Sequence, residues 1–128
     1  MAIPDRLPNG YALQDGYVLE NLLATPQWQT NTPITALAGG GLSSTTPLLV
    51  LGSNDVTVVA TAADSVALPS AVPGSVVFVA NRDSTDSLRI YCQTTDTVEG
   101  AAYVALAAGK RSLFIAVAVN VWVQMLGA

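Results

Sequence analysis

The chain has 128 residues, of which 51% are hydrophobic and only 11% are charged, and its formal net charge is −4. This length is typical of a single domain, and the charged fraction is far below the about 25% of an ordinary globular domain. An acidic chain with five basic residues and no histidine argues against binding to nucleic acid or an anionic membrane, and it rules out Ser-His-Asp catalysis and histidine-ligated zinc.

The low charge also bears on assembly. So few charged residues leave a monomer short of well-solvated surface, so we expect the chain to hide apolar surface against copies of itself or a large partner. Cys92 is the only cysteine, which excludes an intrachain disulfide. Because Cys92 alternates with Ile90 in an apolar run, we predict a buried, unreactive thiol. A chain without disulfides fits assembly in a reducing cytosol.

Residues 1–47 are predicted to form an extended N-terminal arm with one short helix. The helix is expected to begin at Asp15 and to end before Pro26, because apolar residues at 18, 19, 22 and 23 recur at helical spacing. The Gly39–Gly41 run predicts a flexible joint after it. Five prolines prevent any longer element: Pro4, Pro8, Pro26, Pro33 and Pro47.

The arm is too apolar for a disordered tail, and we predict that it binds a partner surface. That surface is left open by the sequence: it is the β domain of the same chain, a neighbouring subunit or another protein. The first six residues lack the basic and apolar regions of a signal peptide. The candidate partner-binding residues are the apolar ones: Ile3, Leu7, Tyr11, Leu13, Tyr17, Leu19, Leu22, Leu23 and Trp28.

Residues 48–128 are predicted to form an all-β domain, an antiparallel β-sandwich or barrel of seven to eight short strands. Short apolar or alternating runs are separated by turn-forming residues every eight to twelve positions, which is typical of these folds. No run has helical periodicity, which disfavours a βαβ architecture. The expected strands cover residues 48–51, 56–60, 65–68, 76–80, 88–93, 103–106, 113–117 and 121–126.

Two of these runs, Val76–Ala80 and Leu113–Val119, are apolar at every position rather than alternately. In a single sandwich one face of each strand should be wet. We therefore expect the second face of both strands to contact the arm or another subunit. The uncharged stretch from Ser112 to Ala128 is too short and too rich in β-branched residues to predict a membrane-spanning helix.

The remaining chemistry-bearing residues are carboxylates at predicted turns. Asp83 and Asp86 flank one loop, and Asp96 and Glu99 flank another. Paired acids are used by glycosidases and by oxygen-ligated cations, but turns also favour aspartate because its side chain bonds the nearby backbone. We expect the turn role, and therefore no catalytic residue, cofactor or metal ion.

The stretch from Thr57 to Ala128 resembles a module of tailed-phage virion proteins. The resemblance lies in the order of turn and strand motifs over more than half of the chain, although the family usually has glycine where Thr95 stands. The matching motifs are Ala62-Ala63-Asp64-Ser65, Leu68-Pro69, Pro73-Gly74, Val76–Ala80, Leu88-Arg89-Ile90, Thr95-Asp96-Thr97-Val98, Ala108-Gly109-Lys110, Leu113–Val119 and Trp122.

The resemblance implies a small β domain of a phage particle, often trimeric, with no catalytic residues. Among such proteins the short chain, the apolar arm and the lack of a fibre shaft favour a capsid decoration protein that bridges neighbouring subunits of the major capsid protein. The expected location is the capsid surface of the virion, after assembly in the host cytoplasm. The alternative is a receptor- or glycan-binding fibre or spike component that uses Tyr91, Tyr103 or Trp122 with loops 82–87 and 94–100.

Overall fold

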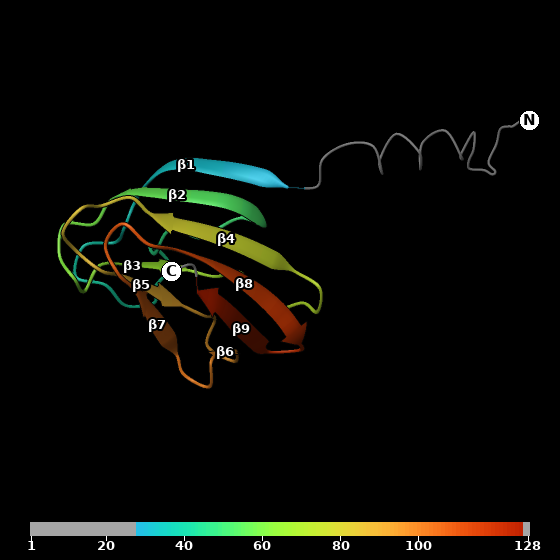
Figure 1. The fold of residues 1–128 in the computed structure, drawn as a ribbon. Helices are drawn as coiled ribbons and strands as arrows, with labels where there is room; N and C mark the ends of the chain where they lie inside the picture. Colours follow the sequence, from blue (N-terminus) through green and yellow to red (C-terminus); the bar gives the residue numbers. More distant parts are fainter. Residues whose placement is uncertain (1–27, 127–128) are drawn as a thin grey trace, which may run out of the picture.

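The computed structural model describes residues 28–126 and contains nine strands and no helix in this part (Figure 1). The expected all-β character is therefore confirmed, whereas the short helix expected after Asp15 lies outside the described residues. The strands are β1 (Gln29–Thr35), β2 (Gly52–Val58), β3 (Ser65–Ala67), β4 (Val76–Asn81), β5 (Leu88–Tyr91), β6 (Thr97–Val98), β7 (Tyr103–Leu106), β8 (Arg111–Ala118) and β9 (Val121–Leu126).

The strands form a six-stranded sheet in the order β1-β2-β4-β8-β9-β6 and a three-stranded sheet in the order β3-β5-β7. Both sheets are mixed, so the expected antiparallel pairing is wrong for four pairs of the described strands, β1–β2, β2–β4, β3–β5 and β6–β9, which are parallel. The physical reason is the route of the chain. From β2 to β5 the chain alternates between the two sheets instead of turning in hairpins, and between β1 and β2 it bridges to β3 at Leu37 and Leu48. Strands of successive passes therefore run in the same direction (Figure 1).

Each pass of the chain, meaning one course from one sheet to the other and back, pairs with the segment about two dozen residues earlier in the sequence. Gly52 of β2 pairs with Gln29 on one side and with Val77 on the other, while Ser65 of β3 pairs with Arg89 of β5. Several side-chain hydrogen bonds join residues 23 to 25 positions apart in the sequence. The stacking of these passes resembles that of a β-solenoid, in which each coil contacts mainly its neighbours.

Seven of the expected strands are confirmed: β7 and β9 with the expected ends, and β2, β3, β4, β5 and β8 with shifted ends. The run at 48–51 forms only an isolated bridge, from Leu48 to Ala67. Two observed strands, β1 and β6, were not expected. Residues 29–35, which the sequence assigned to the arm, form β1, and Ile34 and Ala36 belong to the hydrophobic core.

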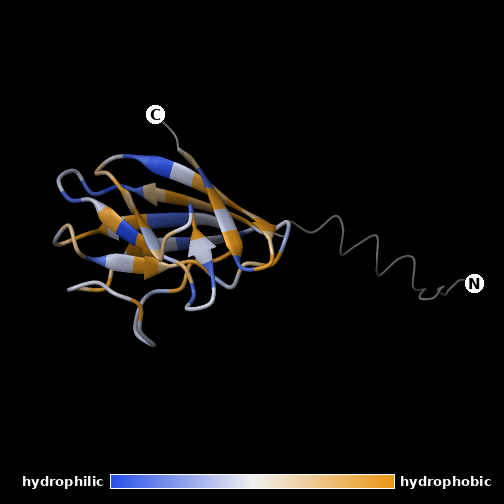
Figure 2. Ribbon diagram, turned by 90° about the horizontal axis from the view of Figure 1, so that it is seen from below, coloured by the Kyte–Doolittle hydropathy of each residue, from blue (hydrophilic) through white to orange (hydrophobic). Residues whose placement is uncertain are grey.

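The core lies between the two sheets. Phe114 and Trp122 from the six-stranded sheet and Leu68, Leu88 and Ile90 from the side of the three-stranded sheet are all fully buried. Several strands are largely hydrophobic (Figure 2), and buried positions alternate with more exposed ones along β4 and most of β8, so that one side of each of these strands points into the core. Burial of this apolar surface is the main contribution to stability.

Buried polar side chains hold the passes of the chain in register. Asp64, only 1% exposed, accepts hydrogen bonds from the backbone N–H groups of Gly39, Ala60 and Thr61 and from the Thr61 hydroxyl. The Gly39 bond crosses to the preceding pass. Beside it, Gly40 has a φ of +72°, and a Cβ there would lie 1.8 Å from the Ala63 carbonyl oxygen, so only glycine fits.

Replacing Asp64 with alanine should therefore weaken the whole fold. The Asp64→Ala variant removes the buried acceptor of four part-buried hydrogen bonds, and we expect the free energy of unfolding to fall by about 2–4 kcal/mol. Urea unfolding followed by circular dichroism measures this change. The control is Asp55→Ala, which removes an exposed ion pair with Arg82 and should cost about 1 kcal/mol or less. Equal losses in the two variants would contradict the bridging role of Asp64.

The contribution of Asp64 should also depend on pH. Burial raises the pKa of this carboxyl, but the hydrogen bonds from Thr61, Gly39 and Ala60 outweigh burial and hold the pKa below its ordinary value of 3.8. The folded state thus binds this proton more weakly than the unfolded state. The stabilisation is complete above the unfolded pKa and is lost as the pH falls through the folded pKa. We expect the difference in the free energy of unfolding between the wild type and Asp64→Asn to shrink in strong acid. A difference that does not change with pH would refute this.

Candidate functional site

The most prominent surface feature of the described residues is the outward side of the six-stranded sheet. On β4, β8 and β9 most inward residues are buried, while the outward residues, apart from Arg111, are also apolar and are half-buried or exposed. No described element covers them. We call this surface the outer apolar face, and it consists of Trp28, Leu51, Val76, Phe78, Leu113, Ile115, Val117, Val121, Val123 and Met125.

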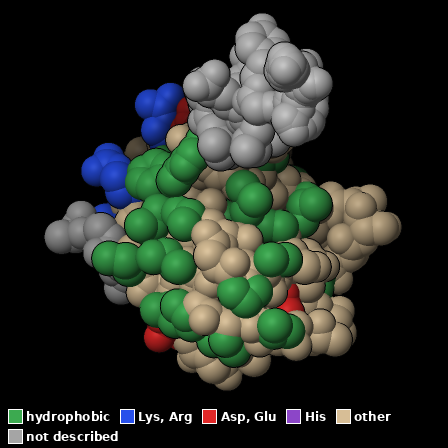
Figure 3. Space-filling model, turned by 90° about the vertical axis from the view of Figure 1, so that its right-hand side faces the viewer, with side chains coloured by type: hydrophobic (Ala, Val, Ile, Leu, Met, Phe, Trp, Pro, Cys, Tyr) green, Lys and Arg blue, Asp and Glu red, His purple; other side chains and the backbone are tan. Residues whose placement is uncertain are grey.

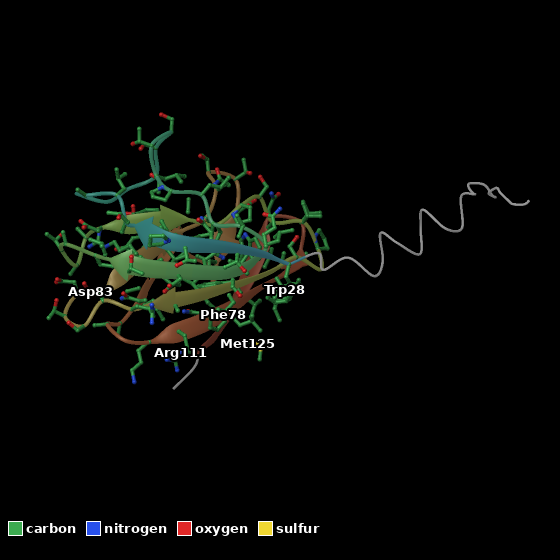
Figure 4. All side chains as sticks on the ribbon, turned by 90° about the horizontal axis from the view of Figure 1, so that it is seen from above. Trp28, Phe78, Asp83, Arg111 and Met125 are labelled. Atoms are coloured by element: carbon green, nitrogen blue, oxygen red, sulfur yellow. The ribbon has the colours of Figure 1, made fainter. Side chains whose placement is uncertain are left out.

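The strand register aligns these side chains in rows across the sheet. One row runs from Val76 through Ile115 to Val123, and the next runs from Phe78 through Leu113 to Met125. Figure 4 shows Phe78 and Met125 close together, with Trp28 towards one end of the sheet and Arg111 towards the other. Directly opposed residues of this kind contact one another, so each row is a continuous apolar ridge.

Trp28 extends the first row at the edge of the sheet. It lines a shallow pocket of about 170 Å³ together with Leu51, Gly52 and Val76. Trp28 remains 55% exposed, and Leu51 remains 43% exposed. A space-filling view shows hydrophobic side chains spread over this end of the molecule, with basic side chains confined to one flank (Figure 3). The apolar surface is therefore larger than β4, β8 and β9 alone.

Charge is almost absent from this surface. Among the described outward residues of β4, β8 and β9, Arg111 is the charged one, and it lies at the end of β8. Arg111 lines a separate, more polar pocket of about 450 Å³ with Arg82 and Lys110, and the Arg82 Nε donates to the Asp55 carboxylate at 2.8 Å. The outer apolar face is thus suited to exclude water against protein and poorly suited to bind an anion.

The predicted partner-binding residues fall mostly outside the described part of the chain. Trp28 is described, and it lies exposed at the edge of the outer apolar face. The list of partner-binding residues omitted the rest of this face, although the runs Val76–Ala80 and Leu113–Val119 predicted a second apolar side that contacts the arm or another subunit. The other candidates lie outside the described residues: Ile3, Leu7, Tyr11, Leu13, Tyr17, Leu19, Leu22 and Leu23.

Of the acidic residues at the predicted turns, Asp83 organises its own turn as expected, whereas the Asp96 and Glu99 side chains instead bond residues 24 or 25 positions away. The Asp83 carboxylate accepts from the backbone N–H groups of Thr85 and Asp86, and these bonds lower its pKa. Asp96 is buried and accepts from the Ala71 backbone and, at 2.6 Å, from the Asn120 side chain. Glu99, which flanks the same loop as Asp96, accepts from the backbone N–H of Gln124.

In both acid pairs the carboxylates are engaged in hydrogen bonds within the protein. Within residues 28–126 no group of three or more acidic, cysteine or histidine residues is placed to hold a metal ion. The same residues include no helix that is long and apolar enough to cross a membrane.

Comparison with protein-family models, curated proteins and solved structures gives no match.

The outward side of the three-stranded sheet carries a small aromatic cluster. The rings of Tyr91 and Tyr103 are 4.8 Å apart between centroids, and the Arg89 guanidinium lies 5.0 Å from the Tyr103 ring centroid. Trp122, which the sequence grouped with these tyrosines as a candidate for glycan binding, is fully buried in the core. Trp122 is therefore part of the core packing and is not exposed for stacking on a glycan.

Cys92 is buried, as predicted, and its thiol lies 3.1 Å from the Asp96 carbonyl oxygen and 3.3 Å from that of Ala102. Burial raises the pKa of the Cys92 thiol, and the nearby negative charge of Asp96 raises it further. Both effects remove the thiolate that thiol reagents require.

We therefore expect the native protein to react with a maleimide or disulfide reagent at least about 100-fold more slowly than the unfolded protein, because reaction requires local opening. The control is Ala105→Cys, which places a second thiol at an exposed position of β7 and should react rapidly in the folded state. Labelling kinetics followed by mass spectrometry give both rates. Rapid reaction of Cys92 in the folded wild type would show that its surroundings are open to reagent.

Proposed function

We propose that this chain is a structural protein of a phage virion, a capsid decoration protein that forms a homo-oligomer and bridges neighbouring subunits of the major capsid protein. The observation that carries the proposal is the outer apolar face, which is nearly free of charge and has no described cover. Such a surface supports a role in protein–protein assembly. The resemblance of residues 57–128 to a phage virion module, often trimeric, supplies the particle and the location on the capsid surface, and the number of copies that assemble is left to the experiment.

We also propose that the two sheets are the layers of a sandwich-like domain, whose stable core anchors the N-terminal arm. The low charge and the structural hydrogen bonds accepted by the carboxylates of Asp83, Asp86, Asp96 and Glu99 support a function without catalysis, cofactor, nucleic acid or membrane. The proposed action is mechanical: the protein fastens capsid subunits to one another.

The arm supplies the proposed contact with the capsid. Its apolar residues, from Ile3 to Trp28, can bury surface against a capsid subunit at about 25 cal/mol per Å². Ordering the arm costs backbone entropy of about 1–2 kcal/mol per residue, so the contact must be extensive to be stable. In an oligomer several arms act together, and each bound arm raises the effective concentration of the next.

The test replaces arm residues in the full-length chain. A variant with serine at Ile3, Leu7, Tyr11, Leu13 and Tyr17 should bind purified capsids at least about 100-fold more weakly, because each lost apolar anchor costs about 1 kcal/mol or more. Sedimentation of capsids with bound protein measures the affinity. The control is the variant Tyr91→Ser with Tyr103→Ser, which removes exposed aromatic groups from the β domain and should bind as the wild type does.

Undiminished capsid binding by the arm variant, or equal weakening in both variants, would contradict bridging by the arm. Counting the copies in each particle by mass spectrometry adds a direct check. Decoration requires many copies on the shell, whereas a tail tip carries few.

A second candidate function is glycan or receptor binding by a tail component, and the exposed Tyr91–Tyr103 pair with Arg89 favours it. Aromatic rings supply flat apolar surfaces on which sugar rings can stack, beside polar groups that fix orientation. A glycan array separates the two proposals. Binding that disappears when Tyr91 and Tyr103 are replaced would support this candidate, and an array without binding, together with many copies per particle, would eliminate it.

A further inference from the structure

We infer that the outer apolar face is the surface through which copies of this chain assemble, each copy packing this face against another copy. This inference rests on the homo-oligomer of the proposed function and assigns it to β4, β8 and β9. The partner is a second copy of the same chain, and the arm then remains available for the capsid.

The shape of the face fits a copy of itself. Its rows, Val76–Ile115–Val123 and Phe78–Leu113–Met125, follow the regular spacing of sheet side chains. Two such faces can interdigitate at the about 10 Å separation of packed sheets. The ten residues of the face carry no charge, and Arg111 and Glu99 lie only at its borders. The face therefore offers little complement to a charged partner, whereas an equally apolar face loses little by leaving water.

The edges of the six-stranded sheet are unsuited to joining copies by strand addition. At one edge, β1 contains Pro33, which has no N–H to donate, and its register with β2 shifts between Asn31 and Ile34 and again before Thr35. At the other edge, β6 is only two residues long. Irregular or very short edge strands oppose edge-to-edge pairing. Association of copies through this sheet must therefore use its face.

The size of the face sets the strength of the contact. Strand spacing and rise give each outward residue about 30 Å² of the sheet plane, so the outer apolar face covers about 300 Å² before the relief of the side chains is counted. A standard protein interface buries about 800 Å² per partner. The face thus supplies the apolar centre of an interface, and flanking surface supplies the remainder. We expect association that depends on concentration in the micromolar range.

The experiment compares the full-length wild type with Val123→Glu, which places a charge on β9, at the end of the row Val76–Ile115–Val123. The wild type should sediment as an oligomer at micromolar concentration, and the variant should sediment as a single chain, with a dissociation constant raised at least 100-fold, because an unpaired charge would be buried in the contact. The matched control is Ala105→Glu, an exposed outward position of β7 opposite Arg89, which should assemble as the wild type does. Circular dichroism establishes that each variant is folded.

A milder variant guards against a failure of Val123→Glu to fold. Val123→Thr keeps the size and β-branching of the side chain and adds one hydroxyl, and it should raise the dissociation constant about tenfold. A wild type that remains a single chain at every concentration would overturn the inference, as would a folded Val123→Glu or Val123→Thr protein that assembles as tightly as the wild type.

The outcome is separable from that of the proposed function. A single-chain protein that still binds capsids overturns the assembly surface alone. An oligomer held by the outer apolar face that does not bind capsids supports the assembly surface and overturns the decoration role.

Discussion

The structure depends on hydrogen bonds made by a few buried polar side chains where one pass of the chain meets the next. Asp64 binds the backbone at Gly39, and Asn54 binds both the Val50 backbone and the Phe78 carbonyl of the following pass. Asp96 joins Ala71 to Asn120 in the same manner. Short strands paired in parallel provide few contacts within one pass, so the register between passes must be fixed by specific bonds. Leaving such groups unpaired in a buried site is costly, which makes each bridge selective for one register.

Correct register has a direct effect on the surface. A shift of one residue in a strand exchanges its inward and outward faces. In β4 and β8 such a shift would be tolerated poorly by Asn81 and Ser112, which are buried and hydrogen-bonded, although it would be nearly neutral for their valine and isoleucine residues. The buried polar residues therefore decide which apolar side faces the core and which forms the outer apolar face. The position of the proposed assembly surface follows from the same bonds that hold the fold.

The sequence predicted most strands correctly because alternation and turn residues are local signals. It missed β1, whose sequence, QTNTPIT, is polar and contains proline, and whose pairing with β2 comes from a strand more than twenty positions away. The parallel direction was also hidden, because an apolar strand has the same pattern in either direction. The sequence showed the candidate surface only as two strands without a polar side. The extent of the surface follows from the strand register, which aligns Val76, Ile115 and Val123 in one row.

The distribution of polar side chains explains why this chain is expected to associate with other protein. Carboxylates and amides that would ordinarily solvate a surface are used internally, as at Asn54, Asp64 and Asp96. The outward side of β4, β8 and β9 is left with valine, isoleucine, leucine, phenylalanine and methionine. Exchanging those residues for polar ones would leave the inward core and the bridges intact, so folding alone does not require them. Their presence on a regular, uncharged face is more economically explained by contact with protein than by the stability of one domain.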